Sequence, residues 1–119
     1  MKKILMIDDD PEIVTLMKDR LEANNYTVVT ACDGEEGLQK MRNENPHLVI
    51  VDIAMPKMDG YTFALELKKI NDLKGIPVVV LTAKDKMKPL FDMEGICHYF
   101  VKPFFADALL KKLKDILGE

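Results

Sequence analysis

Four short hydrophobic runs divide this chain, and each is followed by a polar or charged residue. Runs of this length that are rich in β-branched residues and bounded by turn signals are typical of buried strands. Between them, hydrophobic residues recur at helical spacing, which predicts helices. The runs and the residues that follow them are 4–7 before Asp8, 48–51 before Asp52, 78–81 before Thr82 and 99–101 before Lys102.

The whole pattern predicts five strands and five helices in alternation, an α/β fold with a doubly wound parallel sheet. The second strand is more polar and is expected at the sheet edge, whereas the third is hydrophobic almost throughout and is expected in the centre. Strands are predicted at 3–7, 26–31, 47–51, 78–81 and 97–101. Helices are predicted at about 11–23, 35–43, 60–70 and 105–117, with a short or irregular fourth helix between 88 and 95.

Local signals set several of these limits. Asp10, Pro11 and Glu12 begin the first helix, because Asp caps helices, Pro suits the first turn and Glu favours the positive end of the dipole. Pro46 ends the second helix. Pro89 is tolerated only in a first helical turn, so the fourth helix is predicted to hold less than two turns.

Composition narrows the class of protein. The chain has 119 residues, 48% hydrophobic and 31% charged, which predicts one globular domain over 1–119. A net charge of −3 gives no electrostatic reason to expect direct nucleic-acid binding. No hydrophobic run reaches the roughly 18 residues of a membrane helix. Cys32 and Cys97 lie far apart without metal-like spacing, which favours reduced cysteines and a cytoplasmic protein.

Three aspartates are expected to meet at one edge of the sheet. In a parallel sheet all strands end at the same edge, where ligands of open α/β sheets bind. Asp8 and Asp9 follow the first strand, and Asp52 follows the most hydrophobic one. Any one of them is explained equally well as a solvated turn or a helix cap. Together they repel one another, and oxygen ligands alone favour Mg²⁺ as the cation that relieves this.

Two further residues at this edge complete a phosphoryl-transfer site. Lys102 is fixed before Pro103 and places an ammonium where it can bind a phosphoryl oxygen, although a lysine at a strand end is usually only solvated. Thr82 adds a hydroxyl donor. A metal between carboxylates, a lysine and a hydroxyl is typical of phosphoryl transfer. Tyr99, taken alone, is interpreted as structural.

The sequence lacks the residue patterns that other reaction classes require. The chain has no glycine-rich phosphate loop, which disfavours nucleotides. It has no Ser-His-Asp or Cys-His arrangement, and His47 and His98 are explained as ordinary strand-end residues. Asp52 is therefore the predicted nucleophile toward phosphorus while it remains on the metal.

Short motifs at the strand ends form a specific set. They are Asp8-Asp9, Asp52 with Met55-Pro56 and Met58-Asp59-Gly60, Thr82-Ala83, and Tyr99 three residues before Lys102-Pro103-Phe104. Over nearly the whole chain, this set resembles the receiver domain of two-component response regulators. The resemblance implies a flavodoxin-like sheet of order 2-1-3-4-5, which is also the order of a chemotaxis member of the family.

The resemblance also implies a role for each residue. Asp52 would accept a phosphoryl group from a histidine kinase's phosphohistidine. Asp9, Asp52 and the backbone carbonyl of Ala54 would hold Mg²⁺ (or Mn²⁺) directly, with Asp8 acting through water. Lys102 would be the lysine of the motif. Thr82 and Tyr99 would be the switch pair, the hydroxyl moving to the phosphoryl group while the ring turns inward.

The function expected from the resemblance is a phosphorylation-controlled binding module, not a turnover enzyme. Its partners would be a sensor histidine kinase or phosphotransfer protein and a downstream protein target, with the domain monomeric or weakly dimeric on phosphorylation. Three alternatives stay open: an aspartate-dependent phosphatase, a receiver fold that is never phosphorylated, and the receiver part of a DNA-binding regulator. The phosphatase is disfavoured because Ala54 stands where that class usually has an acid.

Overall fold

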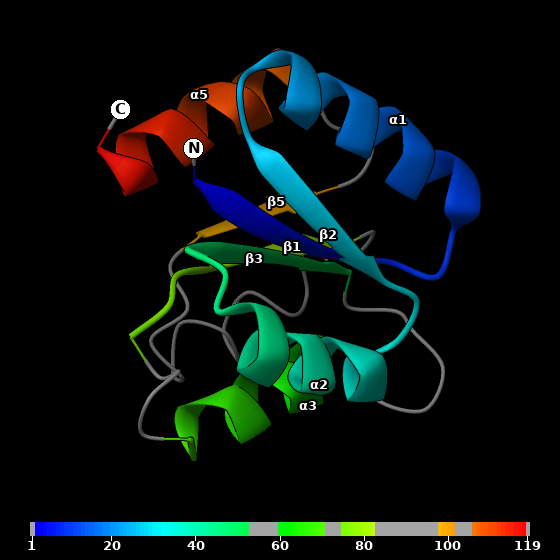
Figure 1. Cartoon of the computed structure of the whole chain (residues 1–119), viewed down its shortest axis with the longest axis vertical. Helices are drawn as coiled ribbons and strands as arrows, with labels where there is room; N and C mark the ends of the chain where they lie inside the picture. Colours follow the sequence, from blue (N-terminus) through cyan, green and yellow to red (C-terminus); the bar gives the residue numbers. More distant parts are fainter. Residues whose placement is uncertain (1, 53–59, 71–74, 83–97, 102–105, 119) are drawn as a thin grey trace.

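The computed structural model describes residues 2–52, 60–70, 75–82, 98–101 and 106–118 (Figure 1). All statements below concern these residues. The strands are β1 (Lys3–Ile7), β2 (Thr27–Ala31), β3 (Leu48–Asp52), β4 (Val78–Thr82) and β5 (His98–Val101). The helices are α1 (Pro11–Ala23), α2 (Gly34–Glu44), α3 (Gly60–Lys68) and α5 (Ala106–Leu117).

The five strands form one parallel sheet in the order β2-β1-β3-β4-β5, which confirms the predicted topology. The predicted positions of the second and third strands are also confirmed. β2 lies at an edge and is only partly buried along most of its length, whereas all five residues of β3 are buried. A central parallel strand is covered on both faces, so it needs hydrophobic side chains throughout.

Helices cover both faces of the sheet (Figure 1). α1 and α5 lie on one face, and α2 and α3 lie on the other. Successive side chains of a strand point to opposite faces. Along β1, Ile4 and Met6 therefore join the cluster under α1 and α5, while Leu5 and Ile7 join the cluster under α2 and α3.

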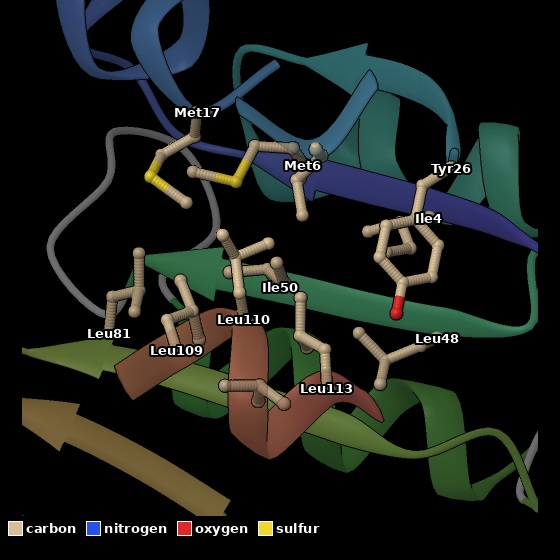
Figure 2. Packing of buried hydrophobic residues seen from close by; sticks show 12 residues of the cluster. Ile4, Met6, Met17, Tyr26, Leu48, Ile50, Leu81, Leu109, Leu110 and Leu113 are labelled. Carbon is tan, nitrogen blue, oxygen red and sulfur yellow. The ribbon is translucent and has the colours of Figure 1, made fainter. Parts of the chain in front are cut away.

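The larger hydrophobic cluster lies under α1 and α5 (Figure 2). Strand residues and helix residues interdigitate there, and most of the side chains are fully buried. Burial of one such Leu or Ile contributes roughly 1.5–3 kcal/mol. The labelled members are Ile4, Met6, Met17, Tyr26, Leu48, Ile50, Leu81, Leu109, Leu110 and Leu113.

Helix α1 begins and ends as its sequence dictates. The Asp10 side chain accepts the Glu12 N–H, with Pro11 at the first helical position. At the other end, Asn25 has φ of 70° and its N–H donates to the Glu22 carbonyl, while the Tyr26 N–H donates to the Leu21 carbonyl. This pair of bonds is a Schellman motif with Asn in the left-handed position. It aims the chain into β2.

The ends of several helices and strands differ from their predicted positions by one or two residues. Tyr26 closes the end of α1 instead of starting β2, and His47 precedes β3, which ends one residue later at Asp52. α2 begins at Gly34, one residue before its predicted start, because Asp33 caps that helix. Leu16 belongs to the helical pattern of α1 but is 62% exposed. The predicted fourth helix lies outside the described residues.

None of the helices in the described part of the chain is long and hydrophobic enough to cross a membrane.

Candidate functional site

Strand register brings the predicted site residues to one edge. β1 ends at Ile7, which pairs with Val51 of β3, so Asp8 and Asp52 are the next residues on neighbouring strands. Asp52 pairs with Leu81, one residue before Thr82. Neighbouring strands lie about 4.8 Å apart. The carboxyl edge therefore collects the ends of β1, β3 and β4, as the sequence predicted.

Three carboxylates form a compact acid cluster at this edge. One oxygen from each of Asp8, Asp9 and Asp52 lies within 4.8 Å of the other two. Asp8 is 2% exposed and Asp52 is 6% exposed, whereas Asp9 is exposed to solvent. Ionised carboxylates this deep need hydrogen bonds or a cation, because burial removes their hydration.

Hydrogen bonds fix the Asp8 end of the cluster. The Asp10 N–H donates to Asp8 Oδ1 at 3.0 Å, and the Asp8 N–H donates to the Ala31 carbonyl at 3.2 Å. The first bond orients the carboxylate, and the second ties the β1–α1 connection to the end of β2. Asp8 is thus tied both to its own loop and to the end of β2.

An open depression of about 460 Å³ lies beside the acid cluster. Asp8 and Asp9 both line it. No motif in the sequence predicts this depression, although the spacing of Glu36 and Lys40 places both on one face of α2. Its lining residues are Asp8, Asp9, Pro11, Val14, Thr30, Ala31, Cys32, Glu36 and Lys40.

Hydrogen bonds around α2 define the chemistry of this depression. Glu36 Oε1 accepts the Cys32 N–H at 2.7 Å, which lowers the pKa of Glu36. Hydrogen bonding and charge repulsion from Glu36 raise the pKa of the Cys32 thiol. The thiol therefore stays protonated at neutral pH, and protonated thiols are poor metal ligands and poor nucleophiles. The hard carboxylate oxygens remain the donors of the site.

The geometry of the cluster fits a small divalent cation. Mg²⁺ prefers oxygen ligands at about 2.0–2.1 Å, so two oxygens on opposite sides of one ion lie roughly 4.2 Å apart. A spread of up to 4.8 Å fits if one carboxylate binds through water or moves inward slightly. The donor set is entirely oxygen, which excludes a preference for the softer metals that thiolates select.

The remaining predicted site residues are described in part or not at all. Thr82 ends β4, where its backbone pairs with Val101, and Tyr99 in β5 pairs with Val80. Their side chains lie outside the description. Ala54 and Lys102 also lie outside the described residues, so their roles stay predictions. By register, Lys102 follows the residue paired with Thr82.

Comparisons with known proteins agree with this fold. The chain matches the family model of the response regulator receiver domain over residues 4–114. It is 39% identical over 118 residues to the alkaline phosphatase synthesis transcriptional regulatory protein PhoP of Bacillus subtilis, covering 98% of this chain and 48% of PhoP. The chain spans about half the length of the curated relatives it matches.

Solved structures give the same picture. The chemotaxis protein CheY4 of Vibrio cholerae is 31% identical with a TM-score of 0.90, over 98% of both chains. The response regulator protein TrrA of Thermotoga maritima, in complex with Mg(2+)-BeF, is 37% identical with a TM-score of 0.88. That match covers 98% of this chain and 99% of TrrA.

Proposed function

This chain belongs to the response regulator receiver domain family, and on that premise we propose that Asp52 is the phosphoacceptor of a phosphorylation-controlled switch. The observation that carries the proposal is the convergence of Asp8, Asp9 and Asp52 within 4.8 Å at the carboxyl edge. Asp52 closes the most buried strand and is 6% exposed. A buried carboxylate beside two others is suited to binding a cation and, with it, a phosphoryl group.

A divalent cation is the natural occupant of this cluster. We propose that Asp9, Asp52 and the carbonyl of Ala54 bind Mg²⁺ (or Mn²⁺) directly, with Asp8 acting through water. The complex of TrrA with Mg(2+)-BeF, in a relative 37% identical, supports this assignment. When bound, Mg²⁺ offsets the charge that accumulates on the phosphoryl oxygens.

The residues of the chain would carry out the transfer itself. An oxygen of Asp52 forms the new O–P bond while the N–P bond of a phosphohistidine breaks, and the electron pair of that bond stays with the imidazole. Burial of Asp52 fixes its position and limits the water around it. Lys102 would bind a phosphoryl oxygen and balance the charge of the acids. Thr82 and Tyr99 would convert the new charge into a change of surface.

The partners follow from this chemistry. The phosphoryl donor would be a sensor histidine kinase or a phosphotransfer protein, and the output would be altered binding to a downstream protein. We propose that the domain is a cytoplasmic signalling module and not a turnover enzyme. Ala54, two residues after Asp52, offers no acid for the leaving-group protonation that a phosphatase needs.

The relatives favour a second arrangement. The curated relatives that the chain matches are named transcriptional regulators, and the chain spans about half their length. This observation favours a receiver that controls a DNA-binding partner domain. The intact mass of the protein purified from its own source distinguishes the arrangements: about 13.5 kDa fits a single-domain regulator, and roughly twice that fits the longer one.

Labelling with acetyl phosphate tests the phosphoacceptor. In the presence of Mg²⁺, intact-mass measurement is expected to show one added phosphoryl group in the wild type, none with EDTA and none in Asp52→Asn. Asp33→Asn is the matched control, because Asp33 is another buried aspartate, at 8% exposure, and lies between the end of β2 and the start of α2. Modification that persists in Asp52→Asn, or disappears equally in Asp33→Asn, would refute the assignment.

A second variant tests the switch. Thr82→Ala is expected to fold, because a polar residue at a strand end contributes little to the core. It should still accept a phosphoryl group at a reduced level but not move Tyr99. Phosphorylation-dependent NMR shifts of Tyr99 that are equal in the wild type and Thr82→Ala would contradict the proposed coupling.

A further inference from the structure

Asp10 connects helix α1 to the acid cluster through two hydrogen bonds. Its side-chain Oδ1 accepts the Glu12 N–H at 3.0 Å, which caps α1. Its own N–H donates to Asp8 Oδ1, also at 3.0 Å. One residue therefore holds the first turn of a helix with its side chain and a buried carboxylate with its backbone.

Each of these bonds depends on the backbone conformation of Asp10. The residue has φ of −93° and ψ of 107°, the extended conformation of a helix N-cap. Pro11 favours the same conformation, because a residue before proline is pushed out of the helical region. The cap bond to Glu12 then fixes the direction in which the Asp10 N–H points. Without the cap, Asp10 keeps the restriction imposed by Pro11 and the bond from the Val14 N–H to its carbonyl, at 3.1 Å.

The bond from Asp10 also limits what Asp8 can do. The Asp10 N–H holds Oδ1 of Asp8, and one oxygen of the same carboxylate lies within 4.8 Å of oxygens of Asp9 and Asp52. Asp8 would act on the cation through water, so the Asp10 N–H would orient an outer group of the metal site. Loss of such outer partners typically weakens metal binding 10–100-fold. Asp10 is itself exposed and is not among the three clustered carboxylates.

We propose that Asp10 is a positioning residue of the site: by capping α1 it holds the N–H that orients the Asp8 carboxylate toward the cation. The inference rests on the metal site proposed above. The negative charge of Asp10 is not needed for this role. Any side chain that caps a helix well should serve, and any side chain that does not should loosen Asp8.

The choice of variants separates capping from charge and from general stability. Asp10→Ala removes the cap, whereas Asp10→Asn and Asp10→Ser remove the charge but keep a capping oxygen. Asp33→Ala is the matched control. Asp33 caps α2 by accepting the Glu36 N–H at 2.8 Å, so its loss removes one charge and one cap elsewhere. Asp10→Gly, with a smaller loss of helix stability, replaces Asp10→Ala if that variant does not fold.

Mg²⁺ titration followed by backbone NMR gives the first readout. Asp10→Ala is expected to raise the Kd for Mg²⁺ about tenfold, while Asp10→Asn, Asp10→Ser and Asp33→Ala stay within about twofold of the wild type. An unchanged Kd in Asp10→Ala would overturn the inference. An equal loss of Mg²⁺ affinity in Asp10→Asn would also overturn it, because the effect would then come from charge. An equal loss in Asp33→Ala would overturn it too, because the effect would then come from general stability.

Amide exchange at residue 10 gives a second readout that needs no metal. In the metal-free protein this amide is expected to exchange slowly in the wild type and Asp10→Asn, and roughly tenfold faster in Asp10→Ala. Equal exchange in all three variants would overturn the capping step. A wild type that shows this protection but binds no Mg²⁺ would instead refute the proposed metal site, so the two failures are distinguishable.

Discussion

The two edges of the sheet use their charged residues in opposite ways. At the amino edge, where β1 and β3 begin, Lys3 Nζ lies 3.1 Å from Glu44 Oε1. The Lys3 N–H also donates to His47 Nδ1 at 3.0 Å, and the His47 N–H donates back to the Lys3 carbonyl. At the carboxyl edge, Asp8, Asp9 and Asp52 bring like charges within 4.8 Å. One edge pairs its polar groups, and the other brings three carboxylates together.

The chain turns at the two edges differ as well. Where strands lead into helices, Asp10 and Asp33 cap α1 and α2. Where helices lead into strands, Asn25 and Asn45 adopt left-handed conformations, with φ of 70° and 48°. Aspartate suits the positive end of a helix, and asparagine tolerates positive φ better than most residues. The comparison teaches that the amino edge pairs its polar groups, whereas the like charges of the carboxyl edge are expected to reduce stability where the metal site is proposed.

The response to Mg²⁺ should separate the edges most clearly. If Mg²⁺ binds the folded state and not the unfolded state, a Mg²⁺ concentration of a hundred times the Kd should stabilise the wild type by about 2.7 kcal/mol. In Asp9→Ala this stabilisation should fall close to zero, because one ligand of the acid cluster is lost. Thermal unfolding with and without Mg²⁺ measures the difference. His47→Ala, at the amino edge, is the control and should keep the full response, so a loss there would break the comparison.

The next largest effect is expected on stability, from a substitution at Asn25, the left-handed residue between α1 and β2. Asn25→Ala is expected to destabilise the protein by roughly 1–2 kcal/mol, since Ala at φ of 70° places its Cβ against the backbone. Asn25→Gly should be neutral or slightly stabilising, because Gly is the preferred residue of the Schellman motif. Urea unfolding compares the variants, and neither should alter the Kd for Mg²⁺. Equal stability of the Ala and Gly variants would show that the conformation does not limit residue choice.

Much of this contrast could be read from the sequence. Parallel strands end at one edge, so the placement of Asp8, Asp9 and Asp52 after their strands was enough to predict that they meet. The strand order followed from the resemblance, and the burial of β3 followed from its composition. Helical spacing in α1 includes Met17 and Leu21, and both are buried.

The details that the sequence did not reveal depend on orientation. Leu16 fits a helical pattern, but Met17 and Leu21 define the buried line and Leu16 lies about 100° away from it; it is 62% exposed. The bond from the Asp10 N–H to Asp8 needs the backbone direction of one residue, which no residue pattern supplies. By contrast, the sequence does carry a signal for the capping of α2 by Asp33. Glu36 stands three residues later, as in a capping box.

Without metal, the acid cluster should reduce stability. Like charges at this separation, with an effective dielectric near 20, repel by roughly 1–4 kcal/mol before screening. Asp9 is exposed, so the net gain from Asp9→Ala in EDTA is expected to be about 1 kcal/mol. The melting temperature in EDTA should therefore rise, although the same variant loses its response to Mg²⁺. A fall in EDTA would show that Asp9 acts mainly as a hydrogen-bond acceptor that stabilises its loop.

The smallest effect concerns a carboxylate beside the cluster that serves the fold. Glu36 accepts the Cys32 N–H, which lowers its pKa below the ordinary value of 4.5. A carboxyl group whose pKa is lower in the folded state contributes stability that is complete above pH 4.5. This contribution is lost as the pH falls through the folded-state value. Since the group is largely solvated, it amounts to less than about 1 kcal/mol.

Glu36→Gln isolates this contribution, because Gln keeps an acceptor for the Cys32 N–H but cannot ionise. The wild type should be the more stable protein at pH 6, and the difference should shrink as the pH falls below 4.5. Urea unfolding at a series of pH values measures it. Asp9→Ala is the useful contrast, since removal of a clustered acid should raise stability at pH 6 where removal of the Glu36 charge lowers it. If the difference in unfolding free energy between the wild type and Glu36→Gln does not change with pH, Glu36 acts by its shape and not by its charge.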